Sequence, residues 1–386
     1  MRIAMTGATS LLGRNLLFEV LRRDPEAVLI LGRSTPTRSL GQRILELFEE
    51  EGVETPTKDV LQKIRCVDMD LDLPGLGMGT EDREFLSANP IDHFFHVAAL
   101  TDFRDTPGVL SALEKTNVEG TRQILDLVAA LRVATFCYLG SAYSCGRVAG
   151  VIAPDHFDLD QEFRNPYERS KLVAEGLVRR FGREAGCRIR VFRPSTICGA
   201  LHDPPLGRTY KFDVFYAWAA FFLRMKLRDV CWSERYETPH RLPARVCYST
   251  ESGLNIIAAD DAAKLMLEAC LQDHADTSFH LAAPEETPHT MYVPLMTEAI
   301  NLQGVEIVAA IPESVNRVEK LYYKTLGRIY TPYVTAPPML FDVTNLEAIR
   351  RGAGIECPRI NPERFRILMS YARSHDFGVP EPLEVQ

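Results

Sequence analysis

The stretch of sequence that decides the fold is TGATSLLG, residues 6–13, which joins a short apolar run at residues 2–5 to a helical pattern. A glycine-rich turn between a strand and a helix lets backbone N–H groups approach a diphosphate, and the helix N-terminus adds positive partial charge. Gly7 permits the tight turn and Gly13 permits close packing of the helix on the strand. Ser10 replaces the middle glycine of the usual pattern, and its hydroxyl could donate to a phosphate. An ordinary glycine-containing turn is the alternative, but the position after the first strand favours a dinucleotide-binding turn. Its expected contacts are Thr6, Gly7, Thr9, Ser10, Leu11, Leu12 and Gly13.

Short apolar runs and helical patterns alternate along the first 200 residues, and this alternation predicts a parallel sheet covered on both faces. The expected strands are Arg2–Met5, Ala27–Leu31, Ile64–Asp68, His93–Val97, Thr135–Leu139 and Arg188–Phe192. The expected helices lie near Leu11–Arg23, Leu40–Glu51, Leu110–Leu131 and Tyr167–Glu184.

The alternation of strand and helix patterns ends after Pro194. This change predicts a second, smaller and mostly helical lobe. Asn255–Ala259 and Ser278–Leu281 are expected to rejoin the sheet. The fold class is therefore α/β: a Rossmann, doubly wound parallel sheet (residues 1–200 plus 251–284) with a C-terminal substrate lobe (residues 201–250 plus 285–386).

Composition narrows the class of protein. The chain has 386 residues, 46% of them hydrophobic, and a net charge of −8 without a long basic run, so nucleic acid is not an expected partner. Nine scattered cysteines without a CxxC pair indicate a reducing compartment and no metal site. No signal-peptide pattern and no apolar stretch of about 20 residues is visible, so we expect a cytoplasmic protein without a transmembrane segment. A homodimer is the candidate assembly.

The end of the second strand bears on cofactor choice. An NAD-binding fold usually carries an acid about 20 residues past the last glycine of the turn, but this chain has Arg33 there, with Arg38 and Arg43 nearby. A guanidinium can pair with a 2′-phosphate, which an acid would repel. Arg33 and Arg43 therefore favour NADPH over NADH, unless Arg33 is an ordinary solvated arginine.

Residues 165–171, NPYERSK, place Tyr167 and Lys171 four residues apart at a helix start, so they share a face. A phenol has a pKa of about 10, and a neighbouring ammonium is expected to lower it. Ser141 ends another expected strand, where its hydroxyl could polarise a carbonyl; Ser144 ranks second. Asn117, within TNVEGT, could order a water that relays protons to Lys171, or could simply face solvent.

These motifs in this order resemble the extended short-chain dehydrogenase/reductase family. The matching segments are TGATSLLG, HVAAL (residues 96–100), TNVEGT, LGSAYSCG, YERSK and RPSTICG (residues 193–199). The resemblance implies a Rossmann domain, with Ala98 and Ala99 under the diphosphate. It also implies that Pro194, Ser195 and Thr196 flank the nicotinamide.

Further segments are similar to the fatty acyl-CoA reductase and thioester reductase branch, the male-sterility-type NAD-binding proteins. They are Asp70-Leu71 with the following PGLG, whose acid would lie near the adenine, the SAY run at 141–143, and Tyr333 with FDVTNL at 341–346. This branch implies NADPH-dependent reduction of an acyl thioester, on CoA or a carrier protein, to an aldehyde or alcohol through Ser141, Tyr167 and Lys171. The alternatives are a nucleotide-sugar epimerase or dehydratase, a ketone reductase, and a non-catalytic NADP-binding sensor.

The sequence leaves the role of one segment undecided. The aromatic residues 212–222 either line an acyl groove or pack the small lobe onto the sheet. The cations around them either meet a CoA or pantetheine phosphate or form a solvated face; they are Arg208, Lys211, Arg224, Lys226 and Arg228.

Overall fold

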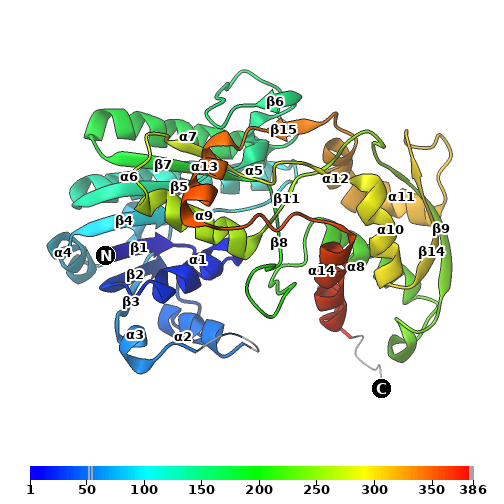
Figure 1. The fold of residues 1–386 in the computed structure, drawn as a ribbon, viewed down its shortest axis with the longest axis horizontal. Coiled ribbons are helices and arrows are strands. Elements are labelled where there is room, and N and C mark those ends of the chain that lie inside the picture. The colour runs from blue at the N-terminus through cyan, green and yellow to red at the C-terminus, as the bar shows by residue number, and fades with distance from the viewer. Residues whose placement is uncertain (51–52, 54, 382–386) are drawn as a thin grey trace.

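The computed structural model describes residues 1–50, 53 and 55–381. Its centre is a seven-stranded sheet in the order β12-β7-β5-β4-β1-β2-β3 (Figure 1), and every neighbouring pair is parallel. The strand order reverses between β1 and β4, which makes this a doubly wound sheet with a ligand crevice at the carboxyl ends of its strands. The predicted fold class is confirmed. The strands are β1 (Arg2–Thr6), β2 (Ala27–Gly32), β3 (Ile64–Asp68), β4 (Ile91–His96), β5 (Val133–Leu139), β7 (Arg188–Pro194) and β12 (Ser278–Leu281).

Successive strand residues face opposite sides of the sheet, and each side has its own apolar core. Ile3 and Met5 pack with α1 (Leu11–Arg22) and α9 (Ala259–Leu271), whereas Ala4 packs with the layer that contains α6 (Gly120–Ala130) and α7 (Pro166–Ala185). The remaining helices of this part are α2 (Leu40–Leu45), α3 (Lys58–Gln62), α4 (Thr80–Ala88) and α5 (Pro107–Leu113).

The C-terminal lobe lies on the right of Figure 1 and has a separate apolar core. Its long aromatic helix, α8 (Phe215–Lys226), buries Tyr216 and Phe222 there. The other elements of the lobe are β9 (His240–Cys247), α10 (His289–Ala299), β14 (Leu302–Val308), α11 (Arg317–Lys324), α12 (Leu326–Val334) and α14 (Pro362–Ser374).

Three details differ from the sequence-based expectation. Ser278–Leu281 joins the main sheet, but β11 (Ile256–Ala258) pairs instead with β8 (Thr196–Cys198) in a separate two-stranded sheet. The helix expected at 110–131 is interrupted by a π-helical segment, Glu114–Glu119, between α5 and α6. Late in the chain, α13 (Thr344–Ala353) packs against the Rossmann core through Leu346 and Ile349. This helix lies within residues 285–386, which were expected to belong to the C-terminal lobe. The remaining short strands are β6 (Gly150–Ile152), β10 (Gly253–Leu254), β13 (Thr287–Pro288) and β15 (Met339–Phe341).

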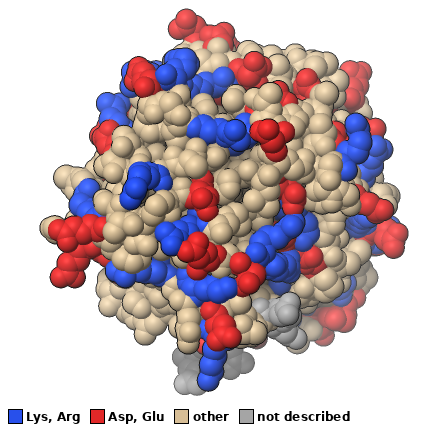
Figure 2. Space-filling model, turned by 60° about the vertical axis from the view of Figure 1, so that its left-hand side comes forward, with Lys and Arg blue, Asp and Glu red and all other residues tan. Residues whose placement is uncertain are grey.

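The surface carries mixed charge, and Figure 2 shows Lys and Arg side chains interspersed with Asp and Glu on one face. Among the described residues, no helix has the length and apolar content needed to cross a bilayer. Within the same residues, no group of three or more His, Cys, Asp or Glu side chains is arranged to hold a metal ion. All nine cysteines are free thiols.

Candidate active site

A cavity of about 960 Å³ runs along the carboxyl edge of the main sheet and reaches the C-terminal lobe. Residues that follow β1, β2, β3, β4, β5 and β7 all line it, as expected for a crevice at strand ends. Most of the predicted site residues face this one cavity. They are Gly7, Thr9, Ser10, Leu11, Leu12, Arg33, Arg43, Asp70, Leu71, Ala98, Ala99, Ser141, Tyr167, Lys171, Pro194, Ser195 and Thr196.

Close backbone contacts explain the two glycines of the first turn. Gly7 has a φ of +72°, and a Cβ there would lie 2.6 Å from the backbone N of Ala98. A Cβ on Gly13 would lie 2.0 Å from the carbonyl oxygen of Gly7. Both positions therefore require glycine, and the backbone of the turn stays open toward the cavity.

Ser10, in the place of the middle glycine, begins α1. Its Oγ accepts a hydrogen bond from the Gly13 N–H at 3.1 Å, which caps the helix. Its hydroxyl proton remains available to donate, since a serine hydroxyl both accepts and donates. The departure from the usual glycine therefore leaves a helix N-terminus that is compatible with an anion.

Thr6 and Gly13 support the turn without lining the cavity. The Thr6 Oγ1 accepts from the backbone N–H groups of Val97 (3.2 Å) and Ala98 (3.1 Å) and pairs with His96 Nδ1 at 2.9 Å. These contacts join the end of β1 to the segment after β4 and fix the floor of the cavity.

Two arginines stand at the end of the cavity near β2. Arg43 donates to the carbonyl oxygen of Arg33 at 2.6 Å and to Thr9 Oγ1 at 3.1 Å. The Arg33 side chain is 65% exposed, and its Nη1 lies 3.8 Å from Asp70 Oδ2. The loosely held Arg33 guanidinium is thus free to meet an anion at the rim.

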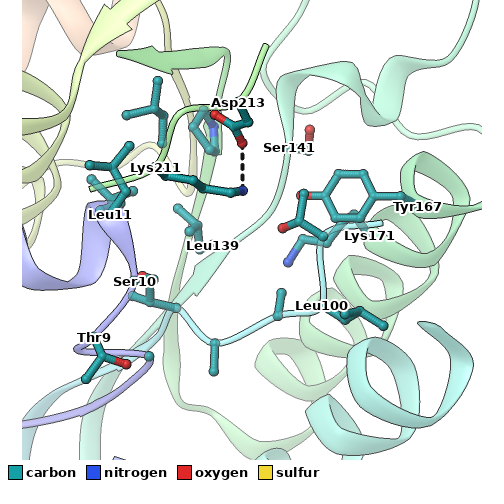
Figure 3. Close-up of a pocket in the computed structure, with 18 of the residues that line it drawn as sticks. Thr9, Ser10, Leu11, Leu100, Leu139, Ser141, Tyr167, Lys171, Lys211 and Asp213 are labelled. Atoms are coloured by element: carbon teal, nitrogen blue, oxygen red, sulfur yellow. Dashed lines mark ion pairs between the residues drawn. The ribbon is translucent and has the colours of Figure 1, made fainter. Parts of the chain in front are cut away.

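The other end of the cavity holds the three groups expected to carry chemistry. Ser141 is the second residue after β5, while Tyr167 and Lys171 lie in the first turns of α7, which Asn165 caps through a bond from the Glu168 N–H. Figure 3 shows all three on the side of the cavity opposite Ser10 and Leu11. Elements distant in the chain therefore converge here.

Ser144, the second-ranked serine, is placed differently. It is fully buried, and its Oγ donates to the carbonyl oxygen of Ser141 at 2.6 Å. Ser141, by contrast, lines the cavity. The placement favours Ser141 as the reactive hydroxyl.

Burial dominates the ionisation of the pair on α7. It raises the pKa of Tyr167 to about 12, with a hydrogen bond from Thr101 opposing the rise. Burial also lowers the pKa of Lys171 to about 7, with the Glu175 carboxylate opposing the fall. The expected lowering of the tyrosine pKa by Lys171 is not found, because desolvation by burial is the largest cause of the shift and raises the pKa of Tyr167. Tyr167 is a protonated phenol at neutral pH, which is the form able to donate a proton.

Asn117 is neither at the cavity nor in solvent. It lies buried in the π-helical segment, a type of distortion found often at functional sites. Its Oδ1 accepts from the Leu100 N–H at 2.7 Å, and its Nδ2 donates to Leu100 O and to Ser170 Oγ, both at 3.0 Å. Both amide protons are used by protein groups, so Asn117 clamps the segment after β4 to α7, and its water relay to Lys171 stays a prediction.

The aromatic segment divides between the two roles left open by the sequence. Phe215 and Trp218 line the cavity, while Tyr216 and Phe222 pack within the lobe. Of the cations that flank this segment in the sequence, only Lys211 lines the cavity among the described residues. Lys226 instead donates to the backbone carbonyls of Ile300 (2.9 Å) and Asn301 (3.1 Å).

Several tyrosines without a predicted role line the cavity, among them Tyr143 and Tyr333. Tyr143 hydrogen-bonds Thr196 Oγ1 at 3.0 Å, and Tyr333, on α12, accepts from Asn165 Nδ2 at 2.5 Å. Their rings meet edge to face, with centroids 5.3 Å apart. The SAY run and the late Tyr333 were the signals in the sequence, and the structure shows that they meet across the two lobes.

Comparison with known proteins identifies the family of this chain. A family model described as "Male sterility protein", of the NAD-binding type, matches residues 5–266. A linear gramicidin synthase polypeptide of Brevibacillus parabrevis is 24% identical over 98% of this chain, and fatty acyl-CoA reductase 2 of Homo sapiens is 28% identical over 52%. The chain spans 7% of the former protein and 44% of the latter.

Solved structures share the fold. The terminal R domain of the myxalamid PKS-NRPS pathway superposes with a TM-score of 0.75 at 20% identity, covering 99% of this chain and 92% of that one. UDP-glucuronic acid 4-epimerase of Bacillus cereus gives 0.64 at 13% identity, covering 97% and 99%. The chain belongs to the male sterility protein family of NAD-binding domains, the fatty acyl-CoA reductase-like branch of the extended short-chain dehydrogenase/reductases.

Proposed function

We propose that this protein is an NADPH-dependent reductase of an acyl thioester, carried on CoA or on a carrier protein, and that the product is an aldehyde or alcohol. The observation that carries the proposal is the convergence of Ser141, Tyr167 and Lys171 on one side of the cavity. The glycine-rich turn at residues 7–12 lines the opposite side. Relatives named as fatty acyl-CoA reductases and as a linear gramicidin synthase support the thioester as substrate class.

The residues present fit a nicotinamide dinucleotide. Gly7 keeps the turn free of a side chain where it lines the cavity, the N-terminus of α1 faces the cavity, and Pro194 and Ser195 line the same cavity as Tyr167. Arg33 and Arg43 would hold a 2′-phosphate at the far end. The bound dinucleotide would supply the hydride.

The protein's own groups then stabilise and protonate the carbonyl oxygen. Tyr167, protonated at neutral pH, donates its proton to the oxygen as negative charge develops there. Ser141 donates a hydrogen bond to the same oxygen. When Lys171 is charged, its ammonium adds positive charge on the same helix face as the Tyr167 phenol. Asn117 holds α7 against the segment after β4 through its hydrogen bond to Ser170.

A substrate panel tests the proposal directly. NADPH oxidation is followed with acyl-CoAs of several chain lengths and with simple ketones, and conversion of UDP-sugars is followed by chromatography of the products, because epimerases and dehydratases consume no net NADPH. Turnover of acyl-CoAs supports the thioester reductase. Turnover of ketones or sugars alone would favour the other extended-family chemistries, and NADPH binding without any turnover would favour a sensor. The cytoplasmic location and the homodimer remain sequence-based predictions.

Cofactor choice has its own test. Arg33→Ala should raise the Kd for NADPH about tenfold while leaving the Kd for NADH nearly unchanged, because a charged hydrogen bond to the 2′-phosphate is lost. Fluorescence titration measures both constants. Arg38→Ala is the matched control, since Arg38 pairs with Glu46 at 2.9 Å and does not line the cavity. Equal weakening for NADPH and NADH would contradict the assignment of Arg33.

A further inference from the structure

A strap formed by residues 207–214 crosses the cavity between the Rossmann part and α8 (Figure 3). Its start is fixed by two backbone bonds, from Gly207 N to Ala200 O (2.7 Å) and from Ala200 N to Arg208 O (2.9 Å). Its end is Val214, which has a φ of +50°, rare for a β-branched residue, and whose N–H donates to the Tyr330 hydroxyl at 3.0 Å. The segment between these anchors carries the side chains that face the cavity.

One ion pair on the strap lies inside the cavity. Lys211 Nζ is 2.7 Å from Asp213 Oδ2, and the two side chains are 51% and 34% exposed. Figure 3 shows Lys211 reaching over the cavity between the Ser10–Leu11 turn and the side that holds Ser141 and Tyr167. An exposed pair of this kind is weak and easily exchanged for a stronger partner.

The other cations that line the cavity stand at its ends or are held by other groups. Arg14 donates to Glu50 at 2.9 Å and stacks on Tyr210, with its guanidinium 3.4 Å from the ring centroid. Arg33 and Arg43 stand at the β2 end, and Lys171 lies against the Tyr138 ring. Lys211 is therefore the cation in the middle of the cavity, among the described residues, between the phosphate-type turn and the catalytic end.

We propose that Lys211 binds the diphosphate of the nicotinamide dinucleotide, leaving Asp213 for a phosphate oxygen, so that the strap closes over the bound cofactor. The inference rests on the proposed function, because it requires a dinucleotide in the cavity. The diphosphate of such a ligand lies at the helix N-terminus after the first strand, and Lys211 faces that turn from across the cavity. A charge-assisted bond to phosphate in this partly enclosed space is stronger than the exposed pair it replaces.

The first test is the NADPH dissociation constant of Lys211→Met, measured by fluorescence titration without any acyl substrate. We expect the Kd to rise about tenfold, as for the loss of one charge-assisted contact. Lys320→Met, at an exposed position on α11, is the matched control and should leave the Kd unchanged. Thermal unfolding of both variants checks that the fold is intact.

The second test uses the competing carboxylate. Asp213→Asn should lower the Kd for NADPH, because Lys211 no longer has to leave a charged partner, and the same change should have no effect in the Lys211→Met background. An unchanged Kd in Lys211→Met, or an effect confined to the KM for acyl-CoA, would overturn the inference; the latter result would assign Lys211 to the substrate's phosphate instead. Failure of the wild-type protein to bind NADPH would overturn the proposed function itself.

Discussion

Replacing Tyr167 with phenylalanine should lower kcat by about 10²–10⁴-fold, the range typical for loss of a positioned general acid. The phenol is the proton donor of the proposed reaction, and its pKa of about 12 keeps it protonated throughout the neutral range. The aromatic ring is retained, so the packing against Phe103, with centroids 5.2 Å apart, should survive. The Kd for NADPH should therefore stay close to the wild-type value, and this separates a chemical defect from a folding defect.

Tyr330→Phe provides the matched control. Tyr330 lines the same cavity, but its hydroxyl accepts a hydrogen bond from the Val214 N–H and lies on α12. Its loss should reduce kcat far less than the loss of the Tyr167 hydroxyl. Both variants are measured by steady-state NADPH oxidation with the best acyl-CoA and by fluorescence titration of NADPH. A Tyr167→Phe enzyme with wild-type kcat would refute the proposed proton donor.

The sequence predicted which groups line one cavity where short segments impose their own geometry. The residues that follow successive parallel strands must meet at one edge of the sheet, so the turn at Gly7, the alanines after β4 and Ser141 share a cavity whatever the rest of the chain does. The four-residue spacing of Tyr167 and Lys171 likewise fixes their common face. Local spacing and strand order are enough to place these groups.

The prediction was weaker where burial and long-range packing decide. The helix containing Asn117 is distorted into a π-helical segment, and the Asn117 amide hydrogen-bonds Leu100 and Ser170, which no short sequence pattern contains. The pKa of Tyr167 depends on how completely the lobe covers it, which no four-residue pattern contains. The place of Lys211 depends on where the strap crosses the cavity, and that is set by a local contact with Ala200 and by a contact with Tyr330, which is distant in sequence.

The largest stability effect is expected at Arg193, in the RPSTICG segment. Its Nε and Nη2 donate to the two carboxylate oxygens of Glu175, at 2.9 and 2.7 Å, and both side chains are fully buried. Arg193→Met should lower the free energy of unfolding by up to about 3–5 kcal/mol, because it leaves the buried Glu175 carboxylate with only Arg179, whose Nε lies 2.7 Å away, as a charged partner. Urea unfolding followed by circular dichroism measures the change.

Two further variants show whether the loss comes from the uncompensated charge. Arg188→Met, on the same strand, removes an exposed arginine 3.8 Å from Asp273 and should cost less than about 1 kcal/mol. The double variant Arg193→Met/Glu175→Met should recover much of the stability, because it removes the buried carboxylate together with Arg193 and leaves only the partly exposed Arg179 without its carboxylate partner. If the double variant were instead as unstable as the sum of its two single variants, packing around Arg193 and not its pairing with Glu175 would hold β7 to α7.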